Sequence, residues 1–144
     1  MPKDNRIIIH HQDGTCPFNV ANIKLSVKDG KLDLEIETHE NEDCVLGFLP
    51  SPTLYVENTE VTARTLAELT REELDVPIGW NTDDNIFRIY IGQHQALDHN
   101  KVTIRRRNPT EIEIDWKSDA VDFNYYDERA RRNVIEAHCV YIVE

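Results

Sequence analysis

The sequence contains no long run of apolar residues. Its uninterrupted apolar runs are short, as in Ile7-Ile8-Ile9, within a chain of 144 residues. A helix that crosses a membrane needs about 20 consecutive apolar residues, so we predict no membrane span and no membrane partner. The polar residues 1–6 are not followed by an apolar segment of secretory length, which argues against a signal peptide.

Glycine is scarce, with five in the whole chain. A loop that cradles phosphate groups needs several glycines close together, and neither that loop nor a Rossmann fingerprint is present. The Gly-x-Ser-x-Gly turn of many hydrolases is also missing. Carboxylates are abundant, but acid–base catalysis needs one that lies in a cleft with a raised pKa. We therefore predict no catalytic residue, no cofactor and no enzymatic activity.

Cysteine is sparse and odd in number, with Cys16, Cys44 and Cys139 far apart in the chain. A secreted disulfide framework is typically denser and even in number. No local nucleophile signature surrounds any of the three. We therefore predict three reduced thiols, at least two of them packed in strands as small apolar residues, and a cytoplasmic location.

Basic residues are absent from a long segment of an acidic chain. The net charge is −11, and no Lys or Arg lies between Lys31 and Arg64. Such a charge repels nucleic acids and attracts basic proteins. The arginine clusters at 105–107 and 129–132 do not make the domain basic, so we predict a basic protein partner and no nucleic acid. The alternative is that the acidic side chains only keep the protein soluble and bind no partner.

Residues 22–38 predict a β-hairpin that turns at Asp29-Gly30. Asp-Gly between alternating strands favours a two-residue turn, since both positions need positive φ. This turn places Leu25 opposite Leu34 on one face and Lys24 opposite Glu35 on the other. A shift by one residue would lose both matches.

A second hairpin is predicted over residues 102–116, with a three-residue loop at 108–110. This loop pairs Arg107 with Glu111, Arg105 with Glu113, Ile104 with Ile114 and Val102 with Trp116. The period-two alternation predicts further strands, in which Arg88 and Tyr90 face outward. Their ranges are 6–11, 43–49, 53–61, 85–91, 121–125 and 133–143.

One helix is predicted over residues 65–75, because Thr65 to Glu68 has the form of a capping box and three leucines form a partial stripe. A single helical turn is expected at 127–132. Many short strands and little helix indicate a mainly β (α+β) fold, either an antiparallel β-sandwich or a partly open barrel. We predict a single domain over residues 1–144.

Two segments carry side chains that could bind a metal ion. His94, Asp98 and His99 lie in one loop and could converge on an ion, although no second ligand pair has zinc-finger spacing. Residues 81–85 resemble the opening of a calcium loop, but Ile86 and Gly92 stand where that loop needs Gly and Glu. We predict no metal, and leave open an ion at the histidine loop.

The strongest signals for an interface are aromatic residues near Arg and carboxylates. Residues 122–129 combine both, and Trp80 lies in a predicted loop. Tyr, Trp and Arg are enriched at binding hot spots, although such aromatics also serve to complete cores. The predicted partner-binding residues are Glu37, Glu40, Glu42, Asp43, Trp80, Tyr125 and Tyr126.

Residues 116–119 and 124–127 resemble the C-terminal part of small bacterial proteins of the toxin-immunity type. The resemblance implies an inhibitor that neutralises a basic partner, and it assigns no residue a role. The alternatives are a structural or adaptor subunit that uses a strand edge, and a hydrolase or isomerase that uses scattered His and carboxylates. For the inhibitor, we expect Glu40, Glu42 and Asp43 to speed association with the partner.

Overall fold

The computed structural model describes residues 5–11, 14–41, 51–80, 86–92, 94–120 and 132–143. Within them the chain forms ten strands and one short 3-10 helix, η1. No helix among these residues is long and apolar enough to cross a membrane. The elements are β1 (Arg6–His11), β2 (Gly14–Lys28), β3 (Lys31–Thr38), β4 (Thr53–Glu60), η1 (Leu66–Glu68), β5 (Arg71–Val76), β6 (Ile86–Tyr90), β7 (His94–Ala96), β8 (Asp98–Asn108), β9 (Glu111–Ala120) and β10 (Asn133–Ile142).

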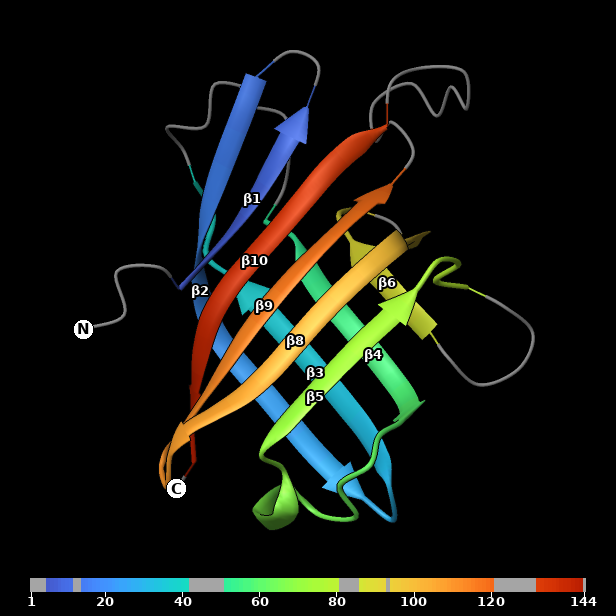
Figure 1. The fold of residues 1–144 in the computed structure, drawn as a ribbon. Coiled ribbons are helices and arrows are strands. Elements are labelled where there is room, and N and C mark those ends of the chain that lie inside the picture. Colours follow the sequence, from blue (N-terminus) through green and yellow to red (C-terminus); the bar gives the residue numbers. More distant parts are fainter. Residues whose placement is uncertain are drawn as a thin grey trace.

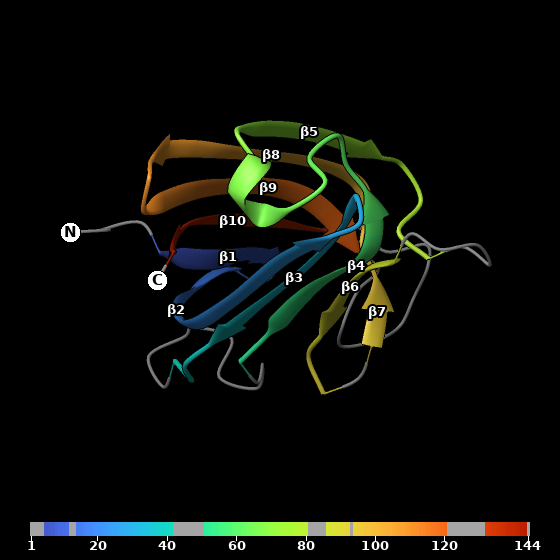
Figure 2. The same cartoon turned by 90° about the horizontal axis from the view of Figure 1, so that it is seen from below.

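The ten strands form one antiparallel sheet in the order β5-β8-β9-β10-β1-β2-β3-β4-β6-β7. The sheet is strongly curled. In Figure 1, β5, β8, β9 and β10 lie in front of β3 and β4. Figure 2 shows β5, β8 and β9 above β2, β3 and β4, with β10 and β1 joining the two halves. The predicted mainly β fold of the open-barrel kind is confirmed.

Alternation along the strands separates an inner, buried face from an outer face. On β1, Ile7 and Ile9 are fully buried, and on β9 so are Ile112 and Ile114. The two halves of the sheet meet inside, where the Phe87 and Trp116 rings pack edge to face with centroids 5.8 Å apart. Apolar burial on this inner face supplies the main driving force for the fold.

The first predicted hairpin is confirmed in full. Leu25 pairs with Leu34, and Lys24 pairs with Glu35. Asp29 and Gly30 have φ angles of 52° and 77°, as the two-residue turn requires.

The second hairpin is confirmed except at its turn. Arg105 pairs with Glu113, as predicted, but Glu111 pairs with Asn108. The register shifts between Arg106 and Asn108, so Arg107 is the extra residue of a β-bulge. The predicted pairing of Arg107 with Glu111 is therefore wrong.

The helix predicted over residues 65–75 is wrong, since only Leu66–Glu68 forms a 3-10 turn and Arg71–Val76 is strand β5. The Arg106 main-chain N–H donates to the Thr70 carbonyl. Its guanidinium donates to the carbonyls of Leu66 and Leu69 at 2.7 and 2.8 Å. These bonds satisfy backbone acceptors and favour pairing of the segment with β8 over a continued helix.

The Glu72 carboxylate holds the loop before β5. It is buried and accepts from the Thr62 N–H at 3.0 Å and the Ala63 N–H at 3.3 Å. A hydrogen bond from the Thr62 hydroxyl completes the set. Burial of this carboxylate is stabilising only because its oxygens are satisfied by these donors.

Two of the three cysteines lie in the described residues. Cys139 is a buried free thiol, and burial raises its pKa to about 12. Cys16 is disulfide-bonded. The prediction of three reduced thiols is therefore wrong for Cys16, and this removes the cysteine argument for a reducing compartment.

Several predicted elements lie wholly or largely outside the described residues: the strands at 43–49 and 121–125 and the helical turn at 127–132. The alternation predicted β1, β4, β6 and β10, the last three with ranges that extend one residue past at least one end of the strand. It did not predict β5, β7 or the first half of β2.

Candidate partner-binding face

Aromatic side chains and one arginine gather on the outer face of β4, β6 and β7. Tyr55 alternates with buried Leu54 and Val56, and Arg88 alternates with buried Phe87 and Ile89. Since opposed residues of antiparallel strands share a face, the pairing of Tyr55 with Arg88 places both outward. We define the aromatic patch as Tyr55, Trp80, Arg88, Tyr90 and His94.

Contacts within the aromatic patch are close. The Arg88 guanidinium lies 4.1 Å from the centroid of the Tyr55 ring, and its Nε donates to His94 Nδ1 at 3.1 Å. The Tyr90 and His94 rings pack edge to face with centroids 4.7 Å apart. Arg88 also forms an ion pair with Glu57. These contacts restrict the side chains, which lowers the entropy cost of binding through them.

Trp80 extends the patch beside β6. It forms an antiparallel bridge with Ile86, and the bridge places Trp80 on the same face as Ile86 and Arg88. Half of the Trp80 surface is exposed, at 50%, and Tyr90 is 41% exposed. Large aromatic side chains left open to solvent on one face indicate a binding surface.

Gly79 anchors Trp80 to the sheet. Its carbonyl accepts from the Phe87 N–H at 2.7 Å, and its N–H donates to Asp98 Oδ1 at 3.0 Å. A Cβ at this position would overlap the carbonyl oxygens of Leu97 and Phe87. The close approach of three backbone segments therefore requires glycine here.

A row of carboxylates borders the aromatic patch on β3. Glu37 pairs with Thr53, and Thr53 pairs with Tyr90 in the same row across the sheet. Glu35 is opposite Tyr55 in the next row. Burial raises the pKa of Tyr55, and the charge of Glu35 raises it further, so the phenol stays a neutral hydrogen-bond donor and acceptor at neutral pH.

The same face is hollowed between β2 and β6. A groove of about 570 Å³ is lined in part by Lys24, Asp33, Glu35, Tyr55, Glu57 and Arg88. We call it the acidic groove. Lys24 lies 3.5 Å from Glu35 and 4.0 Å from Glu37, and Asp33 accepts from the Asn58 N–H at 2.9 Å. Lys24 therefore pairs with two carboxylates, of which Glu35 lines the groove.

The structure places three of the seven residues predicted to bind the partner. Glu37 lies on the outer face of β3, Glu40 is exposed beyond its end, and Trp80 lies in the aromatic patch. Glu42, Asp43, Tyr125 and Tyr126 are outside the described residues. Tyr55 and His94 were missed, although alternation on β4 marks Tyr55 as outward.

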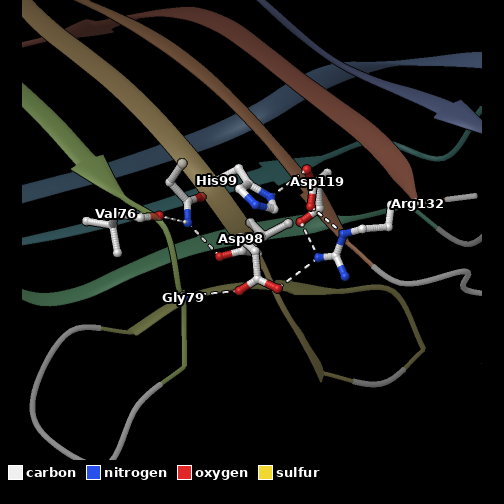
Figure 3. A network of polar contacts seen from close by, with 8 residues as sticks. Val76, Gly79, Asp98, His99, Asp119 and Arg132 are labelled. Atoms are coloured by element: carbon white, nitrogen blue, oxygen red, sulfur yellow. Dashed lines mark hydrogen bonds and ion pairs between the residues drawn. The ribbon is translucent and has the colours of Figure 1, made fainter. Parts of the chain in front are cut away.

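His94, Asp98 and His99 do not converge. His94 contacts Arg88 and Tyr90 on the outer face, whereas Asp98 and His99 belong to the network of Figure 3. In that network Asp98 accepts from Arg132 at 2.8 Å, and His99 Nδ1 lies 2.8 Å from Asp119 Oδ2. These protein contacts use the groups that a metal ion would need.

Among the residues that the structure describes, Glu113, Asp115 and His138 form a group of potential metal ligands on the outer face. Glu113 already accepts from Arg105 at 2.6 Å and from Arg107 at 2.7 Å. Hydrogen bonding to Arg105 is the main reason that the pKa of Glu113 is lowered. Asp115 contacts His138 Nδ1, while Glu113 faces the other ring nitrogen. The arrangement fits an ion-pair network better than a metal site.

Comparisons with known proteins identify no relative. The chain matches no protein-family model, no curated protein and no solved structure.

Proposed function

We propose that this protein is a non-enzymatic binding protein of the immunity type, an acidic inhibitor whose aromatic patch and acidic groove bind a basic partner protein. One observation carries the proposal. Glu37 and Tyr90 share one outer row across Thr53, so carboxylates and aromatic anchors lie side by side on one face.

The two parts of this face support binding in different ways. Exposed carboxylates attract a basic partner and raise the association rate, with a range of about 8 Å at physiological salt. Trp80, Tyr90 and Arg88 belong to the residue types that dominate binding energy once they are desolvated. The acids therefore govern the rate of association, and the aromatic patch governs the lifetime of the complex.

An adaptor that pairs through a strand edge is the alternative, and the two ends of the sheet support it less. The edge strand β5 exposes Arg71, Glu73 and Asp75 at alternate positions, and charged side chains on an edge oppose strand addition. The other edge strand, β7, has only three residues. Recognition through side chains on the outer face fits the structure better.

A cytoplasmic location stays a prediction. The bonded state of Cys16 counts against it, because disulfides are rare in reducing compartments. The proposed inhibitor can act in either setting, since recognition depends on the outer face and not on the thiols.

The test is capture of a partner from the native cell by the wild-type protein at low salt, followed by capture with Trp80→Ala/Tyr90→Ala. We expect the double variant to lose the partner. Ile142→Ala is the matched control, since Ile142 is 53% exposed on β10 and lies outside the aromatic patch; it should retain the partner. Equal capture by the double variant and the wild type would contradict the proposal.

A further inference from the structure

A second groove lies on the opposite half of the sheet, and its lining holds three cations together with two carboxylates, Asp115 and Glu136. Its volume is about 490 Å³, within the range of about 300–1,000 Å³ for small-molecule sites. Strands β8, β9, β10 and β1 form its floor, and Figure 1 shows these four strands side by side. The outward side chains that line it include Arg6, Ile8, Lys101, Thr103, Lys117 and His138.

Three cations in this groove form no ion pair with any residue that the structure describes. Arg6, Lys101 and Lys117 are exposed, and none lies within ion-pair distance of a carboxylate among the described residues. By contrast, Lys24 and Lys31 on the acidic half each contact a glutamate. The chain has a net charge of −11 and few basic residues. Three of these basic residues, without ion pairs, nevertheless gather around one groove.

The two lysines face each other directly. Lys101 on β8 pairs with Lys117 on β9, and like charges in opposed positions destabilise a sheet. Both carboxylates of the groove contact histidines: Glu136, which is opposite Lys117 in the strand pairing, lies 2.7 Å from His10 Nε2, and Asp115 contacts His138. An anion between the two lysines would relieve their repulsion.

We propose that this groove binds a small molecule through its phosphoryl group. A phosphomonoester carries about −1.5 to −2 charge at pH 7 and presents three acceptor oxygens. The opposed Lys101 and Lys117 ammonium groups match that charge, and the Arg6 guanidinium lines the same groove. The Thr103 hydroxyl offers a further donor, and Ile8 offers apolar contact to the rest of the molecule. This site is separate from the acidic groove and does not depend on the proposed inhibitor function.

The test is an amide NMR titration of the full chain with inorganic phosphate, phenyl phosphate and benzoate at constant ionic strength. We expect saturable shifts at Lys101, Thr103, Lys117 and Ala137 with phenyl phosphate, and weaker ones with phosphate alone. Lys101→Gln/Lys117→Gln should weaken binding by at least about tenfold, as for the loss of a charge-assisted hydrogen bond. Lys101→Arg/Lys117→Arg should retain it.

The matched control is Lys24→Gln/Lys28→Gln, which removes two positive charges from the acidic half of the outer face and should leave binding unchanged. An equal loss of phenyl phosphate affinity in the control and in Lys101→Gln/Lys117→Gln would overturn the proposed site. Shifts that do not saturate, or that are spread over the whole surface, would also overturn it. Binding of benzoate without phenyl phosphate would overturn the phosphoryl assignment.

Discussion

The guanidinium of Arg88 lies over the ring of Tyr55, with its central carbon 4.1 Å from the ring centroid. The same guanidinium pairs with Glu57 and donates to His94. One side chain thus joins β4, β6 and β7 on the outer face and holds two aromatic rings of the patch in place. A cation over an aromatic face contributes about 0.5–2 kcal/mol, depending on its exposure.

Arg88→Met should therefore lower the free energy of unfolding by about 1–2 kcal/mol, because it removes the cation over Tyr55 and leaves Glu57 unpaired. Denaturant unfolding measures the change. The control is Arg71→Met on the edge strand β5, whose side chain is half exposed and forms an ion pair with Glu73, and it should change stability by less than about 0.5 kcal/mol. Equal effects of the two substitutions would refute the structural role of Arg88.

Gly79→Ala should destabilise the protein by at least about 2 kcal/mol, since a methyl group there overlaps two backbone carbonyls that cannot both move aside. Thermal and denaturant unfolding report the loss. Ile78→Ala, at the exposed neighbouring position, should leave stability within about 0.5 kcal/mol of the wild type. A Gly79→Ala variant as stable as the wild type would show that Gly79 does not pack against Leu97 and Phe87 as described.

Glu113 should make stability fall in acid. Its pKa in the folded protein is lowered from 4.5, so its contribution is present above pH 4.5 and is lost as pH falls through the lowered pKa. Glu113→Gln should cost roughly 1–3 kcal/mol at pH 7, because Arg105 and Arg107 lose a buried charged acceptor. In unfolding curves taken between neutral and acid pH, its deficit relative to the wild type should shrink toward low pH, whereas Glu73→Gln should follow the wild type. A loss of stability in Glu113→Gln that is the same at all pH values would contradict a lowered pKa of Glu113 in the folded protein.

The disulfide at Cys16 predicts sensitivity to reductant. Native disulfides typically contribute about 2–4 kcal/mol, so a reducing agent should lower the melting temperature of the wild type. Cys16→Ser should show the lower value without reductant and should not respond to it. Non-reducing alkylation and mass spectrometry should find Cys16 blocked and Cys139 unmodified until the protein unfolds. A wild-type melting temperature that is the same with and without reductant would contradict the disulfide at Cys16.

Local signals in the sequence were sufficient where partners are close in the chain. Asp29-Gly30 and the alternation around it fix the pairing of Leu25 with Leu34, because a shift of one residue would expose the apolar face. The same reasoning failed at residues 65–75. Thr65 and Glu68 favour a helix locally, but Arg106, on a strand about 40 residues away, donates hydrogen bonds to this segment. The local sequence pattern does not predict these long-range hydrogen bonds.

The candidate sites also divide into features that local sequence patterns predict and features that depend on long-range strand pairing. Alternation predicted that Arg88 and Tyr90 face outward, and composition marked Trp80. That Tyr55 lies beside Arg88 depends on the pairing of β4 with β6. The second groove depends on strand order, since Arg6 lines it together with Lys101 and Lys117 only because β1 pairs with β10 and β10 pairs with β9. Long-range pairing of this kind leaves no signature in one sequence.

The most direct test of the proposed function is the rate of association with the captured partner, measured by stopped flow at low and high salt. Glu37→Gln/Glu40→Gln removes two negative charges from β3 and the residues just after it, whereas Glu73→Gln/Asp75→Asn removes two from the edge strand β5. We predict that the first variant associates more slowly at low salt and has a weaker salt dependence, and that the second matches the wild type more closely. Identical rates and salt slopes for all three proteins would contradict the claim that the acidic face guides a basic partner.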